Sequence, residues 1–110
     1  MSQTVLQPPG WGRPHGYANG IAATGRQVYV AGQVGWNAAG VFESDDLVAQ
    51  TAQALRNVVA VLNEAGAQPA HIVRMTWYLL DRAEYLRRAA EIGNAYRAVI
   101  GKHFPAMSAV

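Results

Sequence analysis

The stretch SDDLVAQTAQALRNVVAVLNEAGAQP, residues 44–69, decides how the chain is organised. It opens with Ser44-Asp45-Asp46, which can cap a helix and place carboxylates at its positive end. The apolar stripe that follows has the spacing of one helix face. It consists of Leu47, Thr51, Leu55, Val58 and Leu62. Because Gly66 favours a helix end and Pro69 marks the exit, the pattern predicts one amphipathic helix between residues 46 and 66.

Strand-like segments lie on both sides of this helix. Residues 71–80, HIVRMTWYLL, carry apolar side chains on both alternating faces, which predicts a central strand covered on both sides. Residues 17–23 and 27–34 predict a hairpin, because the second segment is rich in β-branched and aromatic residues. Residues 1–16 are rich in Pro and Gly and predict an irregular N-terminal arm.

A second helix is predicted after Asp81, which can cap it. Its stripe consists of Leu86, Ala89, Gly93, Tyr96 and Ile100. Gly101 ends this helix, and residues 103–110, HFPAMSAV, are typical of the start of a further strand. The order β-β-α-β-α-β predicts a single α+β domain over residues 1–110, with two helices on one face of a mixed sheet. The other sheet face would be bare in a single copy, which favours assembly.

Composition narrows the class of protein. The absence of cysteine excludes disulfides, thiolate zinc sites and cysteine nucleophiles. Hydrophobic residues make up 51% of the 110 residues and charged residues 15%, against about 25% charged in a typical soluble domain. Such a surface is too small to hide the apolar excess in one copy, so we expect a homo-oligomer.

Charge and the N-terminus exclude other classes. The net charge is +2, and no aromatic cluster accompanies the basic residues, so a nucleic-acid partner is weakly supported. Residues 1–9 lack the pattern of a signal peptide, and no apolar run is long enough to span a bilayer. We therefore expect a cytoplasmic protein without a membrane partner.

Motifs that would carry chemistry are weak. Ser44 or Ser108 could join a histidine and an aspartate in a triad, but nothing resembles a nucleophile elbow. The histidines, His15, His71 and His103, lack the spacing of a metal site, so no metal is predicted.

Arg74 lies in the middle of an apolar strand, where a buried guanidinium needs a partner. A structural ion pair with Asp81 or Glu64 is favoured over an anion-binding role in a cleft. His103 follows the end of a helix, where it could bind an anion, shuttle a proton or cap the helix. Trp77 fits the core or an interface.

Four segments share a pattern with one family. They are residues 31–34 (AGQV), the helix of residues 50–66, residues 73–81 (Val-x-x-Thr-x-Tyr-x-x-Asp) and residues 104–106 (FPA). Over residues 17–110 the chain resembles the reactive intermediate deaminase family, RidA or YjgF, which also carries the older label endoribonuclease L-PSP. The resemblance implies a chorismate-mutase-like fold and a barrel-like homotrimer with clefts between subunits.

The same resemblance implies an activity. Typical members hydrolyse enamines and imines to a 2-keto acid and ammonia and use no cofactor. An arginine holds the substrate carboxylate, a glutamate on the last strand positions water, and a tyrosine, a serine and an asparagine complete the pocket. The strand that would carry the glutamate is expected beyond Val110.

Several positions depart from the family pattern. Tyr17 stands at the pocket tyrosine, whereas Ala31 replaces the serine. Gly93 falls at the asparagine, with Asn94 one residue away. Tyr17 and His103 are the catalytic candidates. The substrate-binding candidates are Ala31, Gly32, Gln33, Trp77, Gly93, Asn94 and Met107.

Met107 stands at the position of the arginine. A thioether cannot donate a hydrogen bond or balance a carboxylate. Loss of such a charge-assisted pair costs about 2–5 kcal/mol in a desolvated cleft. We therefore expect a substrate other than the usual 2-imino acids.

Three functions remain open. The first is a deaminase that acts on a different reactive enamine or imine. The second is a non-catalytic trimer that binds a small metabolite or another protein. The third is the ribonuclease activity of the older label, which the sparse basic residues support least.

Overall fold

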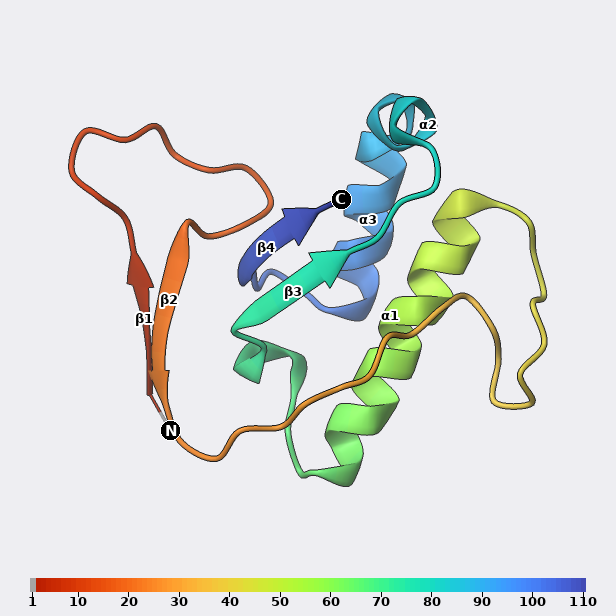
Figure 1. The fold of residues 1–110 in the computed structure, drawn as a ribbon, viewed down its shortest axis with the longest axis horizontal. Coiled ribbons are helices and arrows are strands. Elements are labelled where there is room, and N and C mark those ends of the chain that lie inside the picture. Colours follow the sequence, from red (N-terminus) through yellow and green to blue (C-terminus); the bar gives the residue numbers. More distant parts are fainter. Residues whose placement is uncertain (1) are drawn as a thin grey trace.

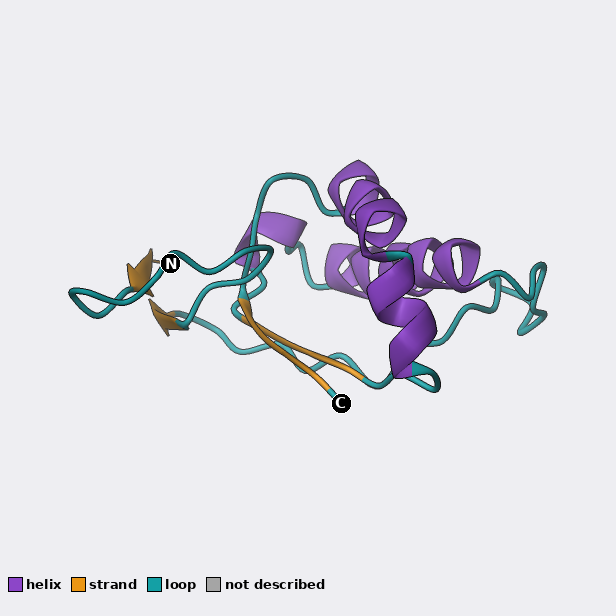
Figure 2. Cartoon of the chain, turned by 90° about the horizontal axis from the view of Figure 1, so that it is seen from above, coloured by secondary structure: helices purple, strands orange, loops and turns teal. Residues whose placement is uncertain are grey.

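A computed structural model describes residues 2–110 as an α+β fold, as predicted (Figure 1). The elements are β1 (Ser2–Leu6), β2 (Gly20–Thr24), α1 (Leu47–Glu64), a 3-10 turn η1 (Pro69–His71), β3 (Arg74–Trp77), α2 (Arg82–Arg87), α3 (Ala89–Val99) and β4 (Ala106–Ala109). Figure 2 shows the helices together on one side of β3 and β4. Among the helices within residues 2–110, none is long and apolar enough to cross a membrane.

The strands form two pairs. β1 and β2 are antiparallel, and β3 and β4 are parallel, with Met75 opposite Met107. A parallel bridge between Ala18 and Ala106 joins the loop before β2 to β4, and the Ala18 amide donates to the Pro105 carbonyl at 3.0 Å. The predicted mixed sheet is thus divided into a parallel pair and an antiparallel pair that approach each other near Ala18.

The N-terminal third corrects two predictions. Residues 2–6, expected in an irregular arm, form β1 and pair with β2. Residues 27–34, expected as a strand, lie in no strand. A strand needs a neighbour to take up its backbone hydrogen bonds, and no described strand pairs with this segment. The segment is instead held at its end near α1, where the Asn57 amide donates to the Val34 carbonyl at 3.0 Å.

Helix α1 confirms its predicted caps. The Asp46 carboxylate accepts a hydrogen bond from the Ala49 amide at 3.0 Å, which satisfies one free N–H of the first turn. Gly66 follows the helix with a φ of 71°, a left-handed conformation that glycine adopts without steric cost. Leu55 and Leu62 of the predicted stripe are buried.

The predicted second helix is divided into α2 and α3. Asp81 caps α2 as expected, accepting from the Glu84 amide at 3.1 Å. At Arg88 the backbone leaves the helical region, with φ −107° and ψ 19°. The Arg88 guanidinium is paired with Asp46 and, at 2.6 Å, with Glu91, so it joins the start of α3 to the start of α1. The hydrogen bond from Arg88 lowers the pKa of Asp46.

The core lies between α1, α3 and the β3–β4 pair. Its buried centre is Leu55, Tyr96 and Ile100. The Tyr96 and Phe104 rings stack with centroids 5.8 Å apart. Residues 71–80 were predicted to form a central strand covered on both faces. This prediction is wrong for a single copy. Beyond the end of β3, Tyr78 is 83% exposed and Leu80 is fully exposed.

Candidate functional site

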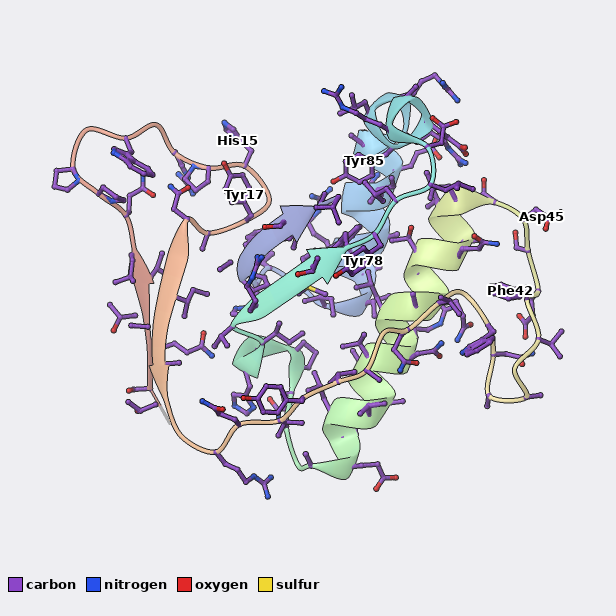
Figure 3. The ribbon with its side chains drawn as sticks, viewed as in Figure 1. His15, Tyr17, Phe42, Asp45, Tyr78 and Tyr85 are labelled. Atoms are coloured by element: carbon purple, nitrogen blue, oxygen red, sulfur yellow. The ribbon has the colours of Figure 1, made fainter. Side chains whose placement is uncertain are left out.

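A cleft of about 400 Å³ lies between α3, the β3–β4 pair and the loop that precedes β2. Its lining is mostly aromatic and aliphatic, and consists of His15, Gly16, Tyr17, Trp77, Tyr85, Ala89, Ile92, Gly93, Tyr96, Arg97, Phe104, Met107 and Ala109. Figure 3 shows His15 and Tyr17 on the loop and Tyr85 on α2, on either side of the end of β4. A volume of this size fits a small metabolite.

The cleft brings four predicted site residues together. Tyr17 comes from the loop before β2, Trp77 from β3, Gly93 from α3 and Met107 from β4. These four positions are separated by up to 90 residues in the sequence. The fold therefore brings together Tyr17, Gly93 and Met107, which the family resemblance indicated, and Trp77, which the strand pattern indicated, although their roles stay predictions.

The other predicted site residues lie outside this cleft. Ala31, Gly32 and Gln33 are in the segment near α1, where the Gln33 amide donates to the Ala31 carbonyl at 3.3 Å. Asn94 is beside the cleft but does not line it. Their contribution to a site would need contacts that a single copy does not make.

In a single copy, His103 contacts two neighbouring segments and does not line the cleft. Its Nε2 lies 2.6 Å from the Ile72 carbonyl oxygen. Its own carbonyl accepts a hydrogen bond from the Tyr96 hydroxyl at 2.5 Å. These two contacts connect the end of α3 to the segment before β3. The predicted catalytic role of His103 is untested by this arrangement.

Arg74 corrects another expectation. Its side chain is exposed, and it donates to the Ser108 hydroxyl at 2.9 Å rather than pairing with Asp81 or Glu64. In the β3–β4 register, residue 74 faces residue 106, so its side chain reaches the neighbouring strand at Ser108. Because water solvates the guanidinium here, no ionic partner is required.

Sequence reasoning missed Arg97, His15 and Tyr85 as lining residues. Arg97 is the most informative, since it brings a permanent positive charge to the helix side of the cleft. It lies four residues after Gly93, and residues at this spacing share one face of a helix. A search of the helix face that carries Gly93 would have found it.

The charge of the cleft is one-sided. Arg97 lines it with a permanent positive charge, and among the described residues no aspartate or glutamate does. The hydroxyls of Tyr17, Tyr85 and Tyr96 add hydrogen-bonding groups, and burial raises the pKa of Tyr96 to about 12. Trp77 Nε1 is buried and has no hydrogen-bond partner in residues 2–110. The site therefore favours an anionic or electron-rich molecule over a cation.

No three histidine, aspartate or glutamate side chains within residues 2–110 come close enough together to hold a metal ion. The residues of the cleft offer hydroxyls, an imidazole and a guanidinium. Their chemistry is the orientation of water and the binding of an anion.

Comparisons with known proteins identify the family. The family model described as endoribonuclease L-PSP matches residues 12–110. The chain belongs to this family, the Rid or YjgF family. A RutC family protein from Pyrococcus abyssi is 30% identical over 111 residues, covering 100% of this chain and 84% of the relative. A RutC family protein from Haemophilus influenzae is 34% identical over 86 residues, covering 78% of this chain and 66% of the relative.

Solved structures agree with this assignment. The Rid family protein YyfB from Yersinia pestis, a protein of unknown function, matches with a TM-score of 0.84 and 34% identity. The match covers 100% of this chain and 86% of that one. A YjgF/YER057c/UK114 family member from Mycobacterium tuberculosis matches with a TM-score of 0.56 and 29% identity, over 99% and 85% of the two chains. The Rid fold predicted from the sequence is thereby confirmed.

Proposed function

We propose that this Rid family protein is a hydrolytic deaminase that converts a reactive enamine or imine into a keto compound and ammonia. The observation that carries the proposal is the cleft itself, which gathers Tyr17, Trp77, Gly93 and Met107 from four separate segments. Tyr17, Gly93 and Met107 are positions at which the family resemblance expects a substrate, and Trp77 adds an apolar wall. The proposal includes a homotrimer with clefts between subunits and no cofactor.

The reaction needs few catalytic groups from the protein. Water adds to the carbon of the C=N bond and forms a carbinolamine. A proton then moves to nitrogen, the C–N bond breaks, and the keto compound and ammonia leave. An enamine must first take a proton on carbon and lose one from nitrogen to give the imine. Positioned water and one hydroxyl that relays protons are sufficient groups for these steps.

We assign Tyr17 to the orientation of that water, because its side chain lines the cleft and is partly exposed. Met107 and Trp77 form the apolar wall against which the substrate lies. We assign His103 a catalytic role only in the assembled trimer, where a neighbouring copy would place the substrate beside it.

A second candidate function is binding of a small metabolite without turnover. The observation that favours it is the apolar character of the lining around Trp77, Phe104 and Met107. A binding protein would retain a small molecule in native mass spectra and would not release ammonia. Ribonuclease activity would instead require RNA binding that weakens steeply with salt.

The test is hydrolysis of imines generated in situ by an amino-acid oxidase and trapped with semicarbazide. We expect the wild-type protein to slow semicarbazone formation for at least one side-chain class. Tyr17→Phe should lower the rate of imine hydrolysis by about 10²-fold or more, the scale of a lost proton-transfer group, so that semicarbazone formation recovers while thermal unfolding is unchanged. Met107→Arg should extend activity to small 2-imino acids.

The outcomes separate the candidates. If wild type and Met107→Arg both fail with every imine, the deaminase proposal is wrong and metabolite binding takes its place. If Met107→Arg alone is active, the fold supports the reaction but this protein does not perform it.

A further inference from the structure

The helix wall of the cleft carries the positive charge that the strand wall lacks. At Met107 on β4 the side chain is uncharged, whereas Arg97 on α3 lines the same cleft. Because a thioether cannot bind an anion, an anionic ligand in this cleft would be held from α3 rather than from β4. The position of the guanidinium therefore decides which way a charged ligand points.

Gly93 leaves room for the guanidinium. A Cβ atom added at Gly93 would lie 3.4 Å from Arg97 Nη1 and 3.9 Å from Nη2. The arginine side chain thus folds back over the glycine along the helix face. A larger side chain at residue 93 would occupy this space and move the guanidinium.

Asn94 contacts the guanidinium of Arg97, and both residues are exposed. Arg97 Nη2 donates to the Asn94 side-chain oxygen at 2.5 Å. An arginine has five N–H donors, and within residues 2–110 no carboxylate pairs with Arg97. The remaining donors are available to an acceptor that enters the cleft.

The surroundings select the rest of the ligand. Trp77, Tyr85, Phe104 and Met107 line the cleft with aromatic and sulfur-containing side chains. These groups suit a planar or bulky apolar body. A molecule with an apolar body and one terminal oxyanion would match both parts of the site.

We propose that Arg97, held by Asn94 over Gly93, binds the carboxylate of an aromatic substrate and so orients the C=N group in the cleft. The inference rests on the proposed function in taking this ligand to be an enamine or imine. It makes Arg97 a specificity-determining residue and gives Asn94 a positioning role through the guanidinium.

The binding test compares an acid with a neutral ketone of similar shape. Calorimetry would measure phenylpyruvate, the keto product of an aromatic imino acid, against phenylacetone, which lacks the carboxylate. Because Arg97 is exposed, we expect Arg97→Gln to weaken phenylpyruvate binding by about twofold to fivefold and to leave phenylacetone binding unchanged. Arg97→Lys should recover part of the loss, because the charge remains but the planar fork does not.

The matched control is Arg87→Gln. Arg87 is an exposed arginine of α2 that does not line the cleft, so its removal lowers the net charge equally. Equal loss of phenylpyruvate binding in Arg87→Gln and Arg97→Gln would overturn the proposal, as would unchanged binding in Arg97→Gln. Tighter binding of phenyl phosphate than of phenylpyruvate would overturn the assignment to a carboxylate.

The rate of imine hydrolysis separates this inference from the deaminase proposal. If aromatic imines are hydrolysed and Arg97→Gln leaves kcat/KM unchanged, the deaminase stands and the role of Arg97 is wrong. If no imine is hydrolysed but phenylpyruvate binding depends on Arg97, the carboxylate site stands and the deaminase proposal fails.

Discussion

Residues 47–110 bury their apolar side chains against one another, whereas residues 2–46 leave most of theirs in solvent. The buried apolar residues of the second region come from α1, α3 and the segment before β4, and they are Leu55, Leu62, Ile92, Tyr96, Ile100 and Pro105. In the first region Ala18 is buried. Its large apolar side chains are exposed, among them Val5, Trp11, Tyr29, Val41 and Phe42.

The two regions differ in how their backbone N–H and C=O groups find hydrogen-bond partners. A helix makes its own hydrogen bonds and needs a neighbour for one face, so α1 and α3 can pack against the β3–β4 pair and close a core. A strand depends on a second strand. Residues 27–34 have strand-forming side chains but no described partner strand, and they remain extended and exposed. The apolar surface of the first region is thus the part that the proposed trimer would cover.

The cleft lies at the boundary of the two regions. Its helix and strand walls come from residues 77–109, and His15, Gly16 and Tyr17 come from the first region. The bridge between Ala18 and Ala106 fixes this boundary. Binding at the cleft should therefore depend on both regions, although the free energy of unfolding of a single copy resides mainly in the second.

The largest effect is expected from a core truncation. Leu55 is 4% exposed, and Leu55→Ala should lower the free energy of unfolding by about 2–5 kcal/mol, because it leaves a cavity. Tyr29 is 86% exposed, so Tyr29→Ser should change the stability of a single copy by less than about 0.5 kcal/mol. Urea denaturation at low protein concentration would measure both. A cost at Tyr29 that grows with protein concentration would show that this segment is buried between copies.

A smaller effect is expected where the first region approaches α1. A Cβ atom at Gly35 would lie 2.7 Å from Gln50 Cβ and 2.8 Å from Gln50 Cα. Because a helix backbone cannot move away cheaply, Gly35→Ala should cost about 1–3 kcal/mol. Gly32→Ala is the control, since a Cβ there meets nothing within 4 Å. Equal thermal unfolding of the two variants would contradict the observed packing of Gly35 against α1.

The smallest effect is expected at the Tyr96 hydroxyl. Tyr96→Phe removes the hydrogen bond to the His103 carbonyl and should cost about 0.5–1.5 kcal/mol near neutral pH. Burial raises the pKa of Tyr96 to about 12, above its ordinary value of 10. Its contribution to stability is therefore complete below pH 10 and is lost as the pH rises towards 12.

The free energy of unfolding measured between pH 10 and pH 12 would test whether the Tyr96 hydroxyl loses its stabilising effect as the pH rises. The wild-type protein should lose stability more steeply than Tyr96→Phe above pH 10. Parallel curves for the two proteins would show that the hydroxyl does not titrate from a buried position.

Local patterns were sufficient for some elements. The stripe and caps of α1 are short-range features, so its bounds followed from residues 46–66. Asp81 as a cap and the strand at residues 106–109 were predicted for the same reason. The division between α2 and α3 was not, because Arg88 is held there partly by Asp46, which lies 42 residues earlier in the chain.

The site was predicted in part. The positions of Tyr17, Gly93 and Met107 came from the family resemblance and that of Trp77 from its place on the predicted strand, and the fold places all four in one cleft. Arg97 was missed because charged residues on helices are usually solvated, although its spacing of four residues from Gly93 places both on one helix face. Its importance depends on the lack of a carboxylate among the described residues around it.

The sequence by itself determined the two amphipathic helical segments and the family, because each depends on residue identity or on spacing between residues that are near in the chain. The tertiary structure decided which strands pair, where the second helix breaks and which cation faces the cleft. Those features depend on contacts between residues far apart in the chain, where no local preference selects the partner.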